Sequence, residues 1–253
     1  MSALIETRRL SKAYGDVPAL VDVSIAVNEG ELVSVVGQNG AGKTTLVNTL
    51  TGLLTPTAGD VLFMGESIAG LGPVTLTDRG LVRSFQLIQI FPRLTVAETI
   101  ATAVISRQGK RWRLFARLAA DGAIGARVRE VADIFGLRHR LDTVAAALSQ
   151  GEKKLLDVAS AFALDPKIIL LDEPTSGVST AEKHGIMRIL IAAGKQAGVK
   201  AIVLVEHDMD LVAAYSSRII ALAGGELIAD LPPEKFFADA GLIATVIGKR
   251  RGP

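Results

Sequence analysis

The feature that most constrains this chain is one eight-residue run, Gly37-Gln38-Asn39-Gly40-Ala41-Gly42-Lys43-Thr44. An apolar segment, residues 32–36, comes directly before it, and a helical pattern begins near Gly42 and ends at Gly52. Glycines let the backbone curl so that its N–H groups face an anion, and the dipole of the following helix favours negative charge. This order of strand, glycine-rich turn and helix predicts a phosphate-binding loop.

The polar residues at the end of this loop indicate a nucleoside triphosphate with Mg²⁺. Lys43 is expected to reach the β- and γ-phosphates, and Thr44 is expected to hold the metal. Thr45, the next residue, is assigned to the same binding site. The alternative is a glycine-rich loop that caps a helix beside an incidental lysine. The flanking strand and helix favour the phosphate interpretation.

Two carboxylates follow a second apolar segment, residues 168–171. In a doubly wound sheet the carboxyl ends of the strands line the ligand crevice, so Asp172 and Glu173 are placed where a nucleotide would bind. Asp172 is expected near Mg²⁺ through water, and Glu173 is expected to orient or deprotonate an attacking water. The alternative is a strand that ends in two solvated acids. Together with the phosphate loop, the pair favours hydrolysis.

A third apolar segment, residues 203–205, ends in the same way, at Glu206 and His207. His207 is a candidate for a hydrogen bond to the γ-phosphate. A single histidine is more often structural, so this assignment depends on the other motifs.

Strand and helix patterns divide the rest of the chain. Alternating apolar residues over 21–27 predict one strand with one buried face, and short strands are predicted at 61–64 and 81–82. Residues 219–228 predict a hairpin through two glycines. Residues 95–164 have a mostly helical pattern. Capping boxes, which predict helix starts, are the pairs Thr95 with Glu98, Ser149 with Glu152, and Ser179 with Glu182.

Composition excludes several classes of protein. The chain has no cysteine, which excludes disulfides, cysteine-ligated zinc and thiol nucleophiles. Its 28 Lys and Arg nearly balance 26 Asp and Glu, which argues against a nucleic-acid partner. The apolar runs are too short to span a bilayer, and the first residues lack a signal-peptide pattern. Hydrophobic residues make up 49%, which suits a parallel sheet covered on both faces. A soluble cytoplasmic protein is expected.

One further motif precedes the acidic strand, the run Leu148-Ser149-Gln150-Gly151-Glu152. With the phosphate loop and the strand-end residues in this order, the chain resembles the nucleotide-binding domain of ABC transporters, whose signature is usually LSGGQ. The resemblance covers nearly the whole chain. It implies an α/β fold: a P-loop NTPase core with a mixed sheet, an antiparallel β portion and a helical subdomain. The core is expected at about 1–86 and 166–230, the helical subdomain at 87–165 and a C-terminal tail at 231–253.

The resemblance also assigns roles. The residues that it implies for ATP binding are Tyr14, which would stack on adenine, Gly37, Gln38, Asn39, Gly40, Ala41, Gly42, Lys43, Thr44, Thr45 and Gln86. The metal contacts that it implies are Thr44, Gln86 and Asp172. The implied catalytic residues are Glu173, His207, as the switch histidine, and Lys43. The signature, Leu148 to Glu152, would bind the γ-phosphate of ATP held by a second subunit, which makes two subunits necessary for hydrolysis.

This signature departs from the family pattern. Gln150 replaces a glycine and Glu152 replaces a glutamine, and a carboxylate should repel a γ-phosphate unless it is engaged. We therefore expect Glu152 to turn back to the backbone N–H of Ser149 as its capping-box partner. Ser179 stands where the family usually has an aspartate, which puts communication between subunits at that loop in doubt.

Several segments most resemble the ATP-binding subunits of branched-chain amino acid importers. These segments are residues 83–91 with 94–96, the LSQGE form of the signature, residues 205–212 and the long stretch between 105 and 127. The implied partners are a second nucleotide-binding subunit, identical or paralogous, transmembrane permease subunits and, indirectly, a substrate-binding protein. The implied location is the cytoplasmic face of the inner membrane. The alternatives are subunits that serve amides, urea or lipids, a non-transport ABC ATPase, and a P-loop kinase.

Two segments are candidates for contact with the membrane partner. The groove after Gln86, including Phe91 and Pro92, is the candidate for the partner's coupling helix. The second segment is rich in basic residues, which are Arg107, Lys110, Arg111, Arg113 and Arg117. It is either a contact with the partner or with lipid headgroups, or a solvated helix face with a packed aromatic cluster.

Overall fold

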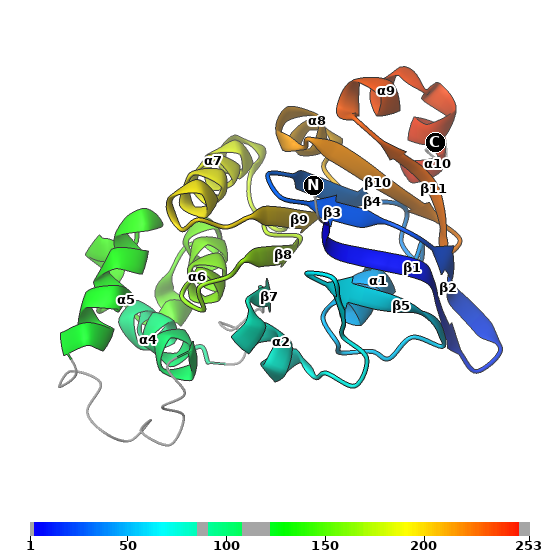
Figure 1. Ribbon diagram of the computed structural model, residues 1–253. Helices are drawn as coiled ribbons and strands as arrows, with labels where there is room; N and C mark the ends of the chain where they lie inside the picture. Colours follow the sequence, from blue (N-terminus) through cyan, green and yellow to red (C-terminus); the bar gives the residue numbers. More distant parts are fainter. Residues whose placement is uncertain (1–2, 85–90, 108–121, 248–253) are drawn as a thin grey trace. The chain divides into compact units, whose positions relative to one another are not determined.

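The computed structural model describes residues 3–84, 91–107 and 122–247 of the chain. These residues form two compact units, one made of Met1–Leu81 with Lys200–Pro253 and the other of Val82–Val199. Figure 1 shows their helices and strands. Among the described residues, no helix has the length and apolar character needed to cross a membrane.

An antiparallel sheet occupies the N-terminal part of the first unit. Its strands are β1 (Ala3–Tyr14), β2 (Val17–Val23), β3 (Ala26–Asn28), β5 (Ala58–Phe63) and β6 (Glu66–Ser67), in the order β2-β1-β5-β6 with β3 also paired to β1. The single strand predicted over 21–27 was wrong, because β2 ends at Val23 and β3 begins at Ala26. Asp22 has a φ of 50°, and Val21 is exposed, so the alternation does not continue through one strand.

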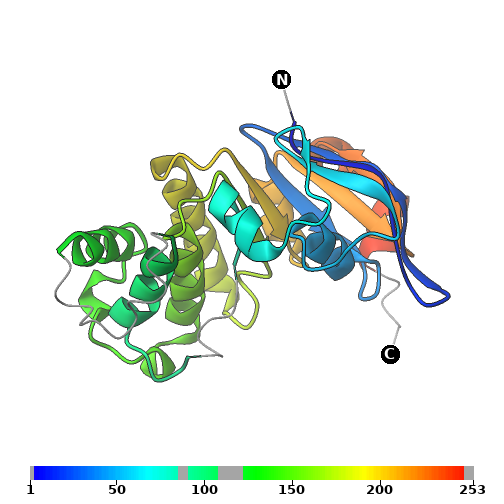
Figure 2. The same cartoon turned by 60° about the horizontal axis from the view of Figure 1, so that its bottom comes forward.

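Four strands of the same unit form a second layer (Figure 2). They are β4 (Leu32–Val36), β9 (Ala201–Val205), β10 (Arg218–Ala223) and β11 (Glu226–Leu231), in the order β11-β10-β4-β9. β9 and β10 run parallel to β4, whereas β11 is antiparallel to β10. The predicted hairpin and the predicted mixed sheet are therefore confirmed. β4 and β9 are buried almost throughout, as expected for a sheet covered on both faces.

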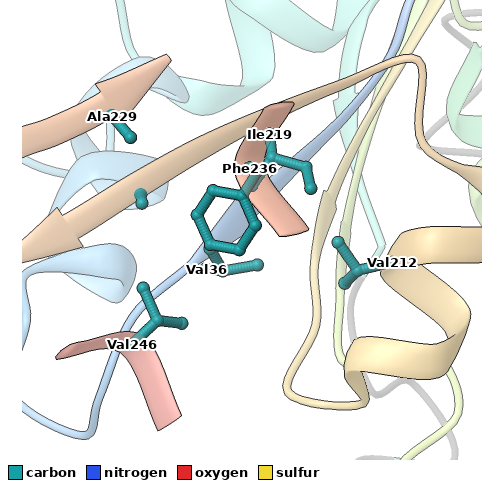
Figure 3. Close-up of a cluster of buried hydrophobic side chains, with 7 residues drawn as sticks. Val36, Val212, Ile219, Ala229, Phe236 and Val246 are labelled. Atoms are coloured by element: carbon teal, nitrogen blue, oxygen red, sulfur yellow. The ribbon is translucent and has the colours of Figure 1, made fainter. Parts of the chain in front are cut away.

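The helices of the first unit are α1 (Lys43–Leu50), α2 (Pro73–Arg79), α8 (Met209–Tyr215), α9 (Pro233–Ala238) and α10 (Ala240–Ile247). A buried apolar cluster joins α8, α9 and α10 to the second layer of strands (Figure 3). In it, Phe236 and Val246 pack with Val36, the last residue of β4. Residues 233–247 lie within the predicted C-terminal tail, and they form two helices that contribute to the core beside the phosphate loop. The bounds of the tail stay a prediction.

The second unit is mostly helical. It contains most of β7 (Leu81–Arg83), β8 (Ile168–Asp172), the helices α4 (Val96–Arg107), α5 (Gly122–Ile134), α6 (Gln150–Phe162) and α7 (Thr180–Gln196), and the 3-10 turns η3 (Arg138–Arg140) and η4 (Ala145–Ala147). α4, α5 and α6 pack against one another. The rings of Phe135 and Phe162 meet edge to face with centroids 5.2 Å apart. The predicted boundaries of the core and the helical subdomain stay a prediction.

Two of the three predicted capping boxes are present. Thr95 and Glu98 bond reciprocally at the start of α4, and Ser149 and Glu152 do so at the start of α6. The third was wrong: Ser179 is the N-cap residue of α7, but its hydroxyl accepts no hydrogen bond from the backbone. It donates instead to the Glu182 carboxylate, so the side chains bond to each other rather than to the helix start.

Candidate nucleotide site

The phosphate loop lies between β4 and α1, as predicted, and two of its glycines are sterically required. Gly37 has a φ of 152°, and a Cβ atom there would lie 2.4 Å from the carbonyl oxygen of Leu222. Gly42, the N-cap residue of α1, has a φ of 101°, and a Cβ atom would lie 2.6 Å from the carbonyl oxygen of Ala19. Both distances are below van der Waals contact, so neighbouring backbone leaves room only for glycine.

Lys43 is turned into the loop. Its side chain is buried, and its Nζ donates to the carbonyl oxygens of Gly37, at 2.6 Å, and Gln38, at 2.9 Å. The ammonium is therefore held at the centre of the curled backbone, the position from which it can neutralise a phosphate. Thr44, at the first turn of α1, is exposed, as are the loop residues Gln38, Asn39 and Gly40.

A cavity of about 450 Å³ opens beside this loop within the first unit. Its wall includes Gly37 and Asn39 from the loop and Glu206 and His207 from the end of β9. His207 is exposed, and its backbone N–H donates to the Glu206 carboxylate at 2.8 Å. The structure thus brings His207, a candidate because it follows an apolar segment, to the same cavity as the phosphate loop.

Of two further residues predicted to contact ATP, the structure describes Tyr14 but not Gln86. Tyr14 ends β1 and is 51% exposed, and the Nζ of Lys12 lies 5.6 Å from its ring centroid. The ring is accessible to a stacking partner. Gln86 lies outside the described residues, so its assignment to ATP and metal contacts stays a prediction.

The C-terminal helix also contacts the loop, which the sequence did not indicate. The Nε2 of Gln38 donates to the carbonyl oxygen of Thr245 in α10 at 2.6 Å, and Ile247 lines the cavity. This bond joins residues 207 positions apart in the chain, and no local pattern could reveal it.

The second unit carries the acidic pair. Asp172 ends β8, and its Oδ2 accepts a hydrogen bond from Arg83 at 2.6 Å, with the Arg83 side chain only 12% exposed. Glu173 follows with a φ of 48°, an uncommon conformation for a residue with a side chain. Backbone strain of this kind concentrates at functional sites. The sequence did not predict this ion pair, because nothing in residues 83–91 indicates that Arg83 contacts Asp172.

The signature turn lies at the start of α6, where Ser149 is the N-cap residue. The Ser149 hydroxyl accepts from the Glu152 N–H at 3.2 Å, and the Glu152 carboxylate accepts from the Ser149 N–H at 2.9 Å. The prediction that Glu152 turns back to Ser149 is therefore confirmed. Leu148 is buried, Gln150 is exposed, and Gly151 is buried against α7. A Cβ atom on Gly151 would meet nothing closer than 3.5 Å.

The Glu152 carboxylate carries the negative charge of this turn. The pKa of its carboxyl is lowered, first by the hydrogen bond from the Ser149 backbone, against the opposing effect of burial, and then by the Arg140 side chain. The carboxylate is thus stabilised in its charged form. A lysine of the same helix, Lys154, donates to the Ser176 hydroxyl at 2.8 Å and to the Glu173 carbonyl oxygen at 3.3 Å. The signature helix is thereby bonded to the loop that follows the acidic pair.

The strand, loop and helix of the first unit define a P-loop nucleotide-binding protein. A family model described as ABC transporter matches residues 20–176. The chain therefore belongs to the ABC transporter family, and it is an ATPase of the ABC type, as the sequence predicted.

Curated relatives cover nearly the whole chain. A probable branched-chain amino acid transport ATP-binding protein, LivG of Archaeoglobus fulgidus, is 31% identical over 97% of this chain and 95% of its own length. A high-affinity branched-chain amino acid transport ATP-binding protein, BraF of Pseudomonas aeruginosa, is 31% identical over 97% of this chain and 98% of its own length.

Solved structures agree on the fold. The ADP conformation of an ATP-binding cassette of an ABC transporter matches with a TM-score of 0.87, at 28% identity over 98% of this chain and 100% of that one. A cbiO1 protein of Clostridium perfringens, part of the ABC transporter complex cbiONQ, matches with a TM-score of 0.81, at 26% identity over 97% of this chain and 95% of that one. The predicted fold class is confirmed.

Proposed function

We propose that this chain binds Mg²⁺-ATP at the phosphate loop and hydrolyses it to energise import of branched-chain or related amino acids through partner membrane subunits. The observation that carries the proposal is the loop itself. Gly37 and Gly42 occupy positions that exclude any side chain, and Lys43 is buried at the loop's centre. The names of the relatives, LivG and BraF, support the substrate class.

The donor groups fit magnesium. Among the described residues, no three histidine or acidic side chains gather into a metal-binding cluster. Mg²⁺ in nucleotide sites is bound by one or two protein oxygens together with substrate phosphates, so such a cluster is not needed. Thr44 and Asp172 supply a hydroxyl and a carboxylate of the suitable type. When bound, the metal would neutralise charge on the phosphates.

Each of these residues would have a separate role in ATP hydrolysis. The loop amides and Lys43 bind phosphate oxygens, Glu173 accepts a proton from the attacking water, and His207 donates a hydrogen bond to the γ-phosphate. The guanidinium of Arg83 contacts one oxygen of the Asp172 carboxylate at 2.6 Å.

Hydrolysis would require two subunits. The Ser149 hydroxyl and the start of α6 are the groups that would bind the γ-phosphate of ATP held by a second copy or a paralogue. The subunits would work peripherally, at the cytoplasmic face of the inner membrane, with permease subunits and indirectly with a substrate-binding protein. Phe91 is 44% exposed and stays our candidate for contact with the coupling helix of the permease.

The test is the oligomeric state of Glu173→Gln with and without ATP, measured by light scattering. This substitution should block hydrolysis and trap a dimer, because the amide cannot accept a proton from water. An ATP-dependent shift from monomer to dimer supports a homodimeric engine. Hydrolysis at the normal rate in this variant would contradict the role of Glu173. Absence of a shift would indicate a paralogous partner or a need for the membrane subunits.

A further inference from the structure

The signature turn carries a carboxylate where the proposed function requires a phosphate to approach. Glu152 stands three residues after Ser149, at the start of α6. Two like charges at close range repel each other, and the repulsion is stronger where the site excludes water. Some feature of the turn must therefore offset the charge of Glu152.

Both oxygens of that carboxylate are engaged in the structure. Its Oε2 accepts from the Ser149 N–H at 2.9 Å, and its Oε1 accepts from the Nε of Arg140 at 2.8 Å. The Glu152 side chain is only 21% exposed. The bond to Ser149 fixes where the carboxylate lies, and the bond to Arg140 brings a positive charge to its other oxygen.

Arg140 reaches this position from a fixed turn. It ends η3, where its backbone N–H donates to the Leu137 carbonyl oxygen at 2.9 Å and its own carbonyl accepts from Thr143 at 2.8 Å. Leu137 is buried in the second unit. These bonds fix the backbone of Arg140 beside the signature turn, and its planar guanidinium loses less rotamer entropy for each hydrogen bond than a lysine ammonium would.

We propose that Arg140 is a positioning residue of the signature. It holds the Glu152 carboxylate on the Ser149 backbone and cancels its charge, so that an approaching γ-phosphate meets the Ser149 hydroxyl beside a neutral pair. In this chain the pair Arg140–Glu152 therefore replaces the uncharged glutamine usual at this signature position. The inference rests on the proposed function, because it concerns the phosphate that the signature would bind.

The main experiment compares four variants of the Glu173→Gln protein: Arg140→Ala, Glu152→Gln, the two combined, and Arg138→Ala. Arg138 is the matched control, because it lies on the same turn and loses the same charge but pairs with Asp133. Light scattering against ATP concentration measures dimerisation, and a fluorescent ATP analogue measures binding to the monomer.

Arg140→Ala should weaken ATP-dependent dimerisation about fivefold, the size expected for one partly exposed ion pair, without changing nucleotide binding to the monomer. Adding Glu152→Gln should restore dimerisation to within about twofold of the parent, because a neutral amide needs no opposing charge. Arg138→Ala should have no effect. The proposal is overturned if the double variant stays as weak as Arg140→Ala, or if Arg138→Ala causes the same loss.

A second measurement does not depend on dimerisation. In ATP-free protein, chemical unfolding of the wild type, both single variants and the double variant forms a double-mutant cycle. The positioning role predicts a coupling of about threefold in the unfolding equilibrium constant. Additive effects would show that Arg140 does not hold Glu152, and the proposal would fail. If the Glu173→Gln protein binds ATP but never dimerises, the proposed homodimer would be contradicted. The double-mutant cycle would still test the role of Arg140.

Discussion

The two helix starts that the proposed function assigns to phosphate, those of α1 and α6, are built by different means. α1 follows Gly42, which has no side chain to accept a hydrogen bond and has a φ of 101°. α6 follows Ser149, whose hydroxyl and capping partner Glu152 bond to the backbone. Because the first N–H groups of any helix lack intrahelical partners, α1 depends on loop and ligand, whereas α6 supplies its own acceptors. Backbone sterics shape the first site, and side-chain hydrogen bonds shape the second.

The sharpest way to break this comparison is Gly42→Ala. The new Cβ atom would lie 2.6 Å from the Ala19 carbonyl oxygen and 3.0 Å from a methyl group of Leu20, at a left-handed backbone conformation. We expect a loss of more than about 3 kcal/mol in the free energy of unfolding, and loss of nucleotide binding. Urea denaturation and titration with a fluorescent ATP analogue measure the two effects. A loss below about 1 kcal/mol would mean that the loop can accommodate a side chain. The start of α1 could then no longer be said to be shaped by backbone sterics.

Ser149→Ala should have a smaller effect on stability. It removes the acceptor of the Glu152 N–H, and loss of an N-cap side chain costs about 1 kcal/mol in the free energy of unfolding. Ser179→Ala is the matched control. The Ser179 hydroxyl accepts nothing from the backbone of α7, so its removal should cost less. Equal losses in urea denaturation would show that the capping bonds do not distinguish these helix starts.

These two serines also show what the sequence could and could not reveal. The same Ser-x-x-Glu pattern predicted both caps, yet only Ser149 forms the box. A hydroxyl can donate as well as accept, and at Ser179 it donates to the carboxylate. The pattern fixes which groups are near each other but not which of them acts as donor, so helix starts were predicted correctly and one cap was not.

The contacts that the sequence did not predict join residues that lie far apart in the chain or in irregular segments. The phosphate loop was predictable because its function depends on backbone geometry over eight consecutive residues. Arg83 meets Asp172 across 89 positions, and Gln38 meets Thr245 across 207. Those contacts exist only after the sheets and helices have packed. Arg140 lies 12 residues before Glu152, within an irregular segment whose turns give no periodic signal.

Gly151→Ala should be tolerated at the signature, unlike Gly42→Ala at the phosphate loop. The nearest neighbour of a Cβ atom at this position would be the Glu182 carboxylate at 3.5 Å, which is ordinary contact. Alanine favours a helix over glycine by up to about 1 kcal/mol, so thermal unfolding should occur at the same temperature or higher. Thermal unfolding at a clearly lower temperature would contradict this interpretation, because it would show that the contact with α7 leaves no room for the methyl group.

The smallest predicted effect is the pH dependence of Glu152→Gln in the ATP-free protein. The pKa of Glu152 is lowered in the folded state from its ordinary value of 4.5, first through the Ser149 backbone bond. A lowered pKa means that the carboxylate adds stability above the unfolded pKa and that this stability is lost as pH falls through the folded pKa. The glutamine keeps an acceptor for the Ser149 N–H, and solvent screens the ion pair. We therefore expect wild type to exceed the variant by less than about 1 kcal/mol at neutral pH.

That difference should shrink as the pH falls below 4.5, since the protonated carboxyl and the amide are both neutral. Urea denaturation at a series of pH values measures it, with Arg138→Ala as the control for a general change in charge. A difference that stays constant with pH would assign the contribution of Glu152 to its shape rather than its charge. The capping box of α6 would then act through its hydrogen bonds without a contribution from charge, and the contrast with α1 would rest on those bonds alone.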